Sequence, residues 1–266
     1  MLDRSRAAIV ALSVLGSGAP FRRRPLAATV ERMTTTQKTI LITGANKGLG
    51  RESARRLLAA GHDVWVAARD PERGRAAADD LGARFVALDV TDDASVAAAA
   101  ETVAAAGGLD VLINNAGIIA STRGVRGESG DEVAAALATN TVGVVRVTRA
   151  FLPLLERSAA PVIVNVSSGL GSFAVTADPE RIEHGIHNLG YSASKAALNM
   201  LTTQYAKALP AFRVNAVDPG YTATDLNGHS GPQTVEQGTE AIVRLAQIGP
   251  DGPTGTFSDA AGPVGW

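Results

Sequence analysis

A short apolar run passes directly into a glycine-rich turn in the segment Thr39-Ile-Leu-Ile-Thr43-Gly44-Ala-Asn46-Lys47-Gly48-Leu-Gly50. Such a run is typical of a strand that is buried on both faces. After Gly50, the residues Ala54, Leu57 and Leu58 recur at the spacing of a helix with one buried face. A helix N-terminus favours an anion, and glycines let the backbone approach it closely. The segment therefore predicts a strand, a turn and a helix that bind the pyrophosphate of a nucleotide.

The spacing of these glycines differs from the general dinucleotide pattern. The chain has G-x-x-x-G-x-G, whereas the general pattern is G-x-G-x-x-G. A glycine turn that binds no ligand is the alternative interpretation, but the strand before and the helix after both favour a nucleotide. We expect the cofactor to contact Gly44, Asn46, Lys47, Gly48, Leu49 and Gly50.

Strand-like and helix-like segments alternate along the remainder of the chain. We expect strands at 39–43, 64–68, 84–88, 109–113, 162–166, 212–217 and 256–257, and helices between Gly50 and Gly61 and at 71–81, 91–105, 131–156, 191–209 and 234–247. Such alternation predicts an α/β fold, a doubly wound parallel sheet with helices on both faces. One such domain accounts for residues 37–266.

Residues 1–36 differ in character from the rest. Arg4 and Arg6 precede an apolar run at 7–15 that is too short to span a bilayer, and three arginines follow at 22–24. A signal or transit peptide is one interpretation. The other is that Met33, just ahead of the first strand, is the true start. In either case we expect residues 1–36 to be disordered.

Composition excludes several classes of function. A hydrophobic content of 45% with 19% charged residues is typical of an ordinary globular protein. A net charge of −1 gives no reason to expect nucleic acid or a membrane as partner. The chain contains no cysteine, which excludes disulfides and thiolate metal sites and fits a cytoplasmic protein. With only four histidines, we expect no metal site.

Polar or glycine residues follow each predicted strand, at the edge where ligands bind in such sheets. They include Asp89 with Val90, the run Asn114-Asn115-Ala116-Gly117, and Pro219-Gly220. Arg69 lies about nineteen residues beyond Gly50, where an acid binds the ribose of NAD or an arginine binds the phosphate of NADP. Lys47 adds a second cation, so we expect NADPH or NADP⁺ rather than NAD. Two solvated surface cations are the alternative.

Tyr191 and Lys195 stand four residues apart, on one face of a predicted helix. Moving a phenol from a pKa near 10 toward 7 requires about 4 kcal/mol. A nearby ammonium and a positively charged oxidised nicotinamide favour the phenolate and so supply such a shift. A plain helix face is the alternative, and the position after the fifth strand argues against it.

Together these motifs resemble the short-chain dehydrogenase/reductase family. The resemblance rests on Thr43-Gly44-Ala-Asn-Lys-Gly48-Leu-Gly50, Asn114 to Gly117, Asn140, Ser168, Tyr191-x-x-x-Lys195 and Pro219-Gly220, in that order, and covers about residues 38–258. It implies a Rossmann-type sheet of about seven strands in the order 3-2-1-4-5-6-7. It also implies a soluble oxidoreductase that uses a nicotinamide cofactor.

The resemblance also implies a role for each matching residue. Tyr191 would donate a proton to the substrate carbonyl oxygen, and Ser168 would hydrogen-bond the same oxygen. Ser168 is chosen over Ser167 because it lies three residues before Gly171. Lys195 would bind the nicotinamide ribose and lower the tyrosine pKa. The remaining roles are a water held by Asn140 and contacts of the nicotinamide carboxamide with Thr222 and Thr224.

Two features are similar to the monomeric NADPH carbonyl reductases of that family. One is the Asn46-Lys47 pair in the glycine turn, and the other is the tail with Gly252-Pro-Thr-Gly-Thr-Phe257 and Trp266. Ser168 and Tyr191 are 23 residues apart (191 − 168), so residues 173–189 contain an insertion of roughly ten residues. In those relatives a longer insertion covers the tetramer-forming helix faces. We therefore expect a monomer or homodimer rather than a tetramer.

The leading hypothesis is an NADPH-dependent reductase of an aldehyde or ketone. Ile118, Ile119, Phe173 and Leu226 favour a hydrophobic carbonyl substrate. One alternative is the reverse direction, alcohol oxidation with NADP⁺ or NAD⁺. The other is a catalytically silent NADP-binding sensor, which the intact set of Asn140, Ser168, Tyr191 and Lys195 argues against.

Overall fold

Seven parallel strands form one sheet in the computed structural model, which describes residues 37–266. The strand order β3-β2-β1-β4-β5-β6-β7 confirms the predicted fold class. The expected disorder of residues 1–36 and the start at Met33 lie outside the described residues. The strands are β1 (Thr39–Thr43), β2 (Asp63–Ala68), β3 (Arg84–Ala87), β4 (Val111–Asn114), β5 (Val162–Val166), β6 (Arg213–Val217) and β7 (Phe257–Ser258).

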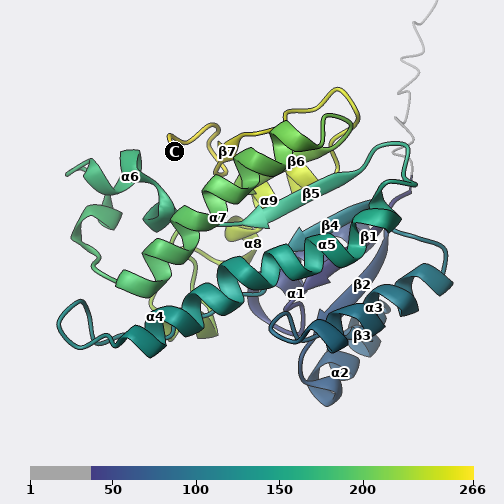
Figure 1. Cartoon of the computed structure of the whole chain (residues 1–266), viewed down its shortest axis with the longest axis horizontal. Helices are drawn as coiled ribbons and strands as arrows, with labels where there is room; N and C mark the ends of the chain where they lie inside the picture. The colour runs from purple at the N-terminus through teal and green to yellow at the C-terminus, as the bar shows by residue number, and fades with distance from the viewer. Residues whose placement is uncertain (1–36) are drawn as a thin grey trace, which may run out of the picture. The chain divides into compact units, whose positions relative to one another are not determined.

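Helices cover both faces of this sheet (Figure 1). They are α1 (Gly48–Ala59), α2 (Pro71–Leu81), α3 (Asp93–Ala105), α4 (Gly130–Leu137), α5 (Gly143–Leu155), α6 (Phe173–Ala177), α7 (Leu189–Ala208), α8 (Val235–Gly238) and α9 (Glu240–Ala246). Successive strand residues face opposite sides, so Ile40 and Ile42 pack with α1, α2 and α9, whereas Leu41 packs with α3 and α5. The two cores fix the strand ends, and with them the edge that carries the predicted site.

Two predicted helices are interrupted. Residues 131–156 were expected to form one helix, but a π-helical turn at Ala138–Val142 separates α4 from α5. Its centre is Asn140, whose buried side chain hydrogen-bonds outside the helix. Residues 234–247 divide into α8 and α9, because Gly238 lies so close to the Thr222 side chain that the chain turns there.

The predicted insertion at 173–189 contains α6 and a 3-10 helix at Ile182–Gly185 before α7 begins. The C-terminal tail lies beside it: Ser172 Oγ donates to Gly265 O at 2.7 Å, and Ala174 N donates to Trp266 O at 3.1 Å. Trp266 in turn stacks on Phe257 of β7, with 5.5 Å between ring centroids. The tail therefore joins the insertion to the last strand. None of the helices in residues 37–266 has the length and apolar content of a membrane-spanning segment.

Candidate active site

A cavity of about 560 Å³ lies at the carboxyl ends of the strands, where sheets of this topology bind ligands. Fifteen predicted residues line it: Gly44, Asn46, Lys47, Gly48, Leu49, Gly50, Arg69, Asp89, Val90, Asn115, Ala116, Gly117, Tyr191, Lys195 and Thr224. Of the predicted apolar substrate contacts, Ile118, Ile119 and Leu226 also line it. Phe173 does not line it, and its side chain is 80% exposed. The residues singled out in the sequence therefore lie at the predicted edge of the sheet and form most of the cavity wall.

The glycine turn forms one end of the cavity because backbone segments approach each other closely there. A Cβ on Gly44 would lie 3.0 Å from Ala116 Cα, and one on Gly50 would lie 2.6 Å from Asn115 Nδ2. Asn115 Nδ2 donates to Thr43 O at 2.8 Å, so the ends of β1 and β4 are tied together. The α1 N-terminus that follows has no side-chain cap, which leaves its N–H groups available to an anion.

Next to this turn, Arg69 and Arg73 line the cavity from the end of β2 and the start of α2. Asp70 lies between them, but its carboxylate caps α2 by accepting from Glu72 N and Arg73 N, each at 3.1 Å. The acid is thus engaged in the helix cap. Lys47 was expected to act beside Arg69, but its Nζ pairs with Asp225 at 2.8 Å, a partner that the sequence analysis did not name.

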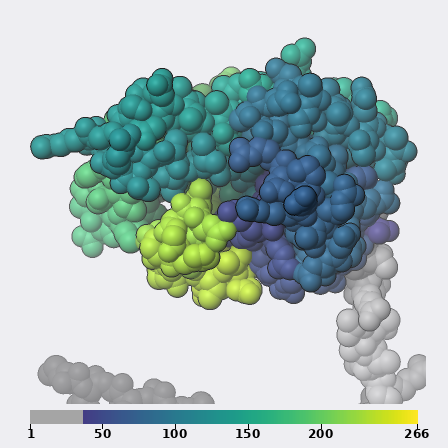
Figure 2. Space-filling model, turned by 90° about the horizontal axis from the view of Figure 1, so that it is seen from below, coloured from purple at the N-terminus to yellow at the C-terminus, as the bar shows by residue number. Residues whose placement is uncertain are grey.

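The Lys47–Asp225 pair joins the glycine turn to the segment that follows β6. A Cβ on Gly48 would lie 3.6 Å from Thr224 Cγ2, so the two segments are in direct contact. Figure 2 shows the yellow segment after β6 lying against the purple first part of the described chain. His229 Nε2 lies 2.8 Å from the other Asp225 oxygen. Both ends of the pair line the cavity, so it forms part of the wall near the predicted phosphate site.

Tyr191 and Lys195 line the cavity from α7, whose N-terminus is fixed by Asn188 accepting from Tyr191 N at 2.7 Å. Lys195 Nζ donates to Val166 O at 2.7 Å and lies 5.5 Å from the centroid of the Tyr191 ring. The tyrosine hydroxyl is within hydrogen-bonding reach of the Ser168 side chain. The arrangement brings a phenol and an ammonium to one wall of the cavity, with the Ser168 hydroxyl next to the phenol, although Ser168 itself does not line the cavity.

The protein groups around Tyr191 raise its pKa rather than lower it; the predicted lowering, which also involves an oxidised nicotinamide, stays a prediction. Burial raises the pKa of Tyr191 to about 12, although the hydrogen bond with Ser168 acts against this shift. Burial also lowers the pKa of Lys195 to about 8. Desolvation disfavours the charged form of each group. For Tyr191 it outweighs the lowering of the pKa that was expected from the Lys195 ammonium. Tyr191 therefore carries its proton at neutral pH.

The two neighbouring serines have different surroundings. Ser167 is buried, and its Oγ donates to Asn199 Oδ1 at 2.6 Å within the core of the structure. Ser168 Oγ accepts from Leu170 N at 3.2 Å and faces Tyr191. Ser168, rather than Ser167, therefore lies next to the tyrosine, and its catalytic role stays a prediction.

Asn140 is fully buried behind the cavity wall. Its Nδ2 donates to Ile118 O and to Ser194 Oγ, and its Oδ1 accepts from Ile118 N, each at 2.9 Å. A Cβ on Gly117 would lie 3.4 Å from Asn140 Oδ1 and 3.5 Å from Lys195 Nζ, so these two polar groups converge on one point. Asn140 thus fixes the segment after Gly117 rather than lining the cavity.

Three predicted cofactor contacts lie outside the cavity wall: Pro219, Gly220 and Thr222. Thr222 is buried, and its Oγ1 donates to Pro219 O at 3.0 Å, so the hydroxyl stabilises its own turn. Seven further residues that were not predicted as site residues line the cavity: Asp70, Arg73, Leu88, Thr91, Thr139, Val166 and Asp225. Thr139 and Asp225 adjoin predicted residues, and that adjacency is the signal that would have indicated them. Within residues 37–266 there is no cluster of three metal-ligating side chains.

Known proteins are similar to this chain in sequence and in fold. The profile described as short chain dehydrogenase matches residues 38–234. (+)-Neomenthol dehydrogenase from Arabidopsis thaliana is 35% identical, with 84% of this chain and 96% of that protein covered. Among solved structures, salutaridine reductase from Papaver somniferum has a TM-score of 0.72 at 30% identity, covering 84% of this chain and 99% of that one. NADPH bound carbonyl reductase from chicken fatty liver has a TM-score of 0.77 at 30% identity, covering 86% and 99%.

A family profile that spans most of the described residues, relatives above 30% identity and the shared sheet topology all agree. They also agree with the motif order from the glycine turn to Tyr191 and Lys195. The chain belongs to the short-chain dehydrogenase/reductase family and is an oxidoreductase of that family.

Proposed function

We propose that the protein reduces an aldehyde or ketone to an alcohol with NADPH. The observation that carries the proposal is the position of Tyr191, flanked by Ser168 and Lys195, on the wall of the cavity that begins at the glycine turn. The names of relatives support it, since they include salutaridine reductase and an NADPH bound carbonyl reductase.

The residues present fit a dinucleotide phosphate. Gly44 and Gly50 make a turn that side chains would fill, and the uncapped N-terminus of α1 adjoins it. Arg69 and Arg73 supply cations on the wall, while Asp70 caps α2 with Oδ1 and pairs with Arg73 Nε through Oδ2 at 3.3 Å. Asp89, Val90, Asn115 and Ala116 complete this end. Bound NADPH supplies a hydride to the carbonyl carbon.

The protein side of the reaction is the delivery of one proton. Tyr191 donates its phenolic proton to the carbonyl oxygen as that oxygen becomes an alkoxide, and Ser168 donates a hydrogen bond to the same oxygen. Lys195 binds the nicotinamide ribose and, as an ammonium, stabilises the phenolate that remains. Hydride plus proton add across the C=O bond, so one alcohol and one NADP⁺ result for each carbonyl and NADPH consumed.

Reduction and alcohol oxidation start from different protonation states of Tyr191. Reduction begins with the phenol as proton donor, and burial raises the pKa of Tyr191 to about 12. Oxidation begins with the phenolate. The intact set of four residues also argues against a silent NADP sensor. Ile118, Ile119 and Leu226 on the wall favour a hydrophobic substrate.

The decisive experiment titrates the protein with NADPH and with NADH, and then follows NADPH oxidation across a panel of aldehydes and ketones. We expect tighter binding of NADPH and turnover of at least one apolar carbonyl. Tyr191→Phe should abolish turnover and leave NADPH affinity within about twofold, because only the transferred proton is lost. A Tyr191→Phe variant with full activity contradicts the mechanism.

Two further expectations go with this function. We propose that the protein is cytoplasmic, which its lack of cysteine fits. We also propose a monomer or homodimer rather than a tetramer. Cell fractionation tests the first, and light scattering after gel filtration tests the second.

A further inference from the structure

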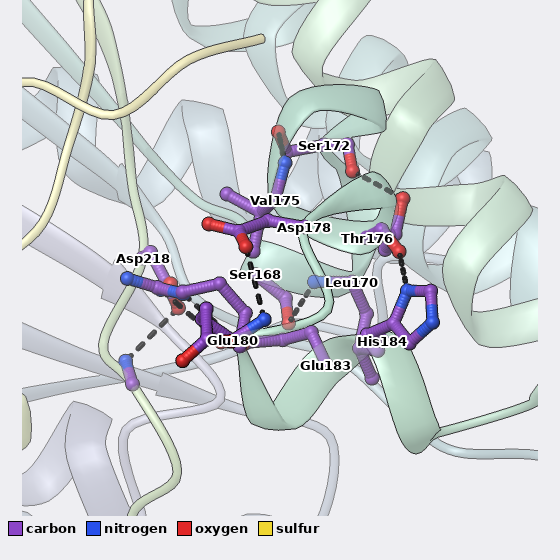
Figure 3. Close-up of polar contacts among 12 residues, drawn as sticks. Ser168, Leu170, Ser172, Val175, Thr176, Asp178, Glu180, Glu183, His184 and Asp218 are labelled. Carbon is purple, nitrogen blue, oxygen red and sulfur yellow. Dashed lines mark hydrogen bonds and ion pairs between the residues drawn. The ribbon is translucent and has the colours of Figure 1, made fainter.

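Asp218 is a buried carboxylate next to the active site that the proposed chemistry does not use. It follows β6 directly, precedes Pro219-Gly220 and is only 4% exposed. Its Oδ1 accepts from Gly220 N at 2.9 Å, and the N–H of Gly169 also donates to the carboxylate. Figure 3 shows Asp218 beside Ser168 and Glu183. A buried charge is costly unless it is well hydrogen-bonded, and these two bonds come from two different turns.

The first of these turns carries the serine of the active site. Gly169 follows Ser168 and begins the 3-10 helix Gly169–Gly171, whereas Gly220 belongs to the turn after β6. A Cβ on Gly169 would lie only 3.0 Å from Asp218 Oδ2, so the serine turn rests directly on the carboxylate. One side chain therefore ties the turn after β5 to the turn after β6.

The insertion reaches the same point from the other side. Glu183 Oε1 would lie 2.8 Å from a Cβ on Gly169, and the Glu183 carboxylate pairs with Arg181 at 3.4 Å. The Glu183 side chain is only 13% exposed. Gly169 is therefore enclosed by two carboxylates, one from the sheet edge and one from the insertion.

We propose that Asp218 is a positioning residue for Ser168: its carboxylate holds the Ser168-Gly169 turn against the Pro219-Gly220 turn and so fixes the serine hydroxyl relative to Tyr191. Glu183 closes the turn from the insertion side. This inference rests on the proposed reductase function, because Ser168 is the group that it positions. A displacement of about 1 Å in such a group lowers turnover strongly.

Burial raises the pKa of Asp218, and in the alkaline range used for the readout, above that pKa, its negative charge provides a second readout. Burial is the main cause of the raised pKa of Tyr191, and the negative charge of Asp218 raises that pKa further. The same charge opposes the lowering of the Lys195 pKa by burial. Removal of the charge should therefore lower the pKa of Tyr191, so the reductase loses its proton donor at a lower pH. The charged groups that face Asp218 are Arg181, Glu183, Tyr191, Lys195 and Asp259.

The test compares Asp218→Asn with Asp259→Asn. Asp259 controls for the loss of a nearby charge: its charge also faces Asp218, but its Oδ1 accepts from Ala261 N and Gly262 N within its own turn and not from the Ser168-Gly169 turn. We expect Asp218→Asn to lower kcat by about tenfold or more with NADPH affinity within about twofold, and to move the alkaline limb of the kcat/KM profile to lower pH. Asp259→Asn should keep kcat within about twofold.

A titration of tyrosinate absorbance in the cofactor-free protein makes the test independent of turnover. The chain has three tyrosines, so subtraction of the Tyr191→Phe curve isolates Tyr191. Wild-type protein that reduces no carbonyl contradicts the proposed function, and this titration then still tests the electrostatic effect of Asp218 on Tyr191. An Asp218→Asn variant with wild-type kcat and wild-type titration overturns the positioning role. So does a variant with lower melting temperature and lower activity but unchanged pH profile.

Gly169→Ala provides the answer if Asp218→Asn does not fold. The added Cβ would push the serine turn away from both carboxylates without removing a charge. We expect a fall in kcat with NADPH binding retained. Wild-type kcat in Gly169→Ala contradicts the inference, since the close approach of turn and carboxylate would then have no effect on the serine.

Discussion

The glycine turn and the insertion lie at two sides of the site and are held in different ways. At the turn, backbone meets backbone: a Cβ on Gly50 would lie 2.8 Å from Ala45 Cα and from Gly44 O. In the insertion, apolar side chains point outward, with Phe173 80% and Ile182 57% exposed. The turn therefore tolerates few residue types, whereas the insertion tolerates many. The turn is thus held by close backbone contacts, whereas the insertion presents exposed side chains.

The largest effect should come from a glycine-to-alanine substitution in the glycine turn, compared with the same substitution in the insertion. Gly50→Ala places a Cβ against backbone atoms that cannot move, so we expect a loss of about 3 kcal/mol in the free energy of unfolding, together with loss of NADPH binding. Gly185→Ala is the matched control, because nothing lies within 4 Å of its Cβ position. Urea unfolding measures both. Equal losses in the free energy of unfolding in the two variants would contradict the difference in packing between the turn and the insertion.

A second prediction concerns the buried ammonium between the two regions. The pKa of Lys195 is about 8 in the folded protein, against an ordinary value of 10.5. The unfolded chain therefore binds more protons between these values, and stability from this group rises as pH rises from about 8 to 10.5. In the wild type, the free energy of unfolding should increase between pH 7 and 10 because of this group. Lys195→Met should make that increase smaller by about 2 kcal/mol.

Thermal unfolding across this pH range measures the effect. Lys207→Met, on the exposed last turn of the same helix, is the control and should keep the wild-type slope. A Lys195→Met variant whose stability rises with pH as in the wild type would show that the ammonium is solvated.

The smallest effect on stability should come from the insertion. Phe173→Ser removes an exposed ring, so we expect a change within about 0.5 kcal/mol in the free energy of unfolding. NADPH affinity should be unchanged, because Phe173 does not line the cavity. Phe257→Ser, at a buried ring under Trp266, should cost about 3 kcal/mol or more. A large loss of stability in Phe173→Ser would show that the insertion is packed as tightly as the turn.

The same contrast explains what the sequence predicted. The glycine turn and the Tyr191–Lys195 pair depend on residues close in the chain, so spacing alone located them on the cavity wall. The Lys47–Asp225 pair depends on a contact between distant segments, and no local pattern contains it. Thr222 follows a predicted strand as expected, but a turn rotates its hydroxyl to Pro219 O. Burial likewise decided the direction of the Tyr191 pKa, and burial is known only once the chain is folded.

The π-helical turn at Ala138–Val142 has a consequence for the register of the chain. Gly143 N bonds to Ala138 O, five residues back, so this turn holds more residues than an α-helical one. Because the extra residue is taken up within this one wider turn, the helix after it keeps its direction and the apolar face of α5, with Val147 and Phe151, stays on the sheet. Deletion of Thr141 would close the turn to a regular α-helical one and leave α5 facing the sheet. The cost would fall on Asn140, since the wider turn is where its side chain reaches Ile118 O and Ser194 Oγ. The extra residue thus lets the helix direct one polar side chain sideways without disturbing how the rest of it packs.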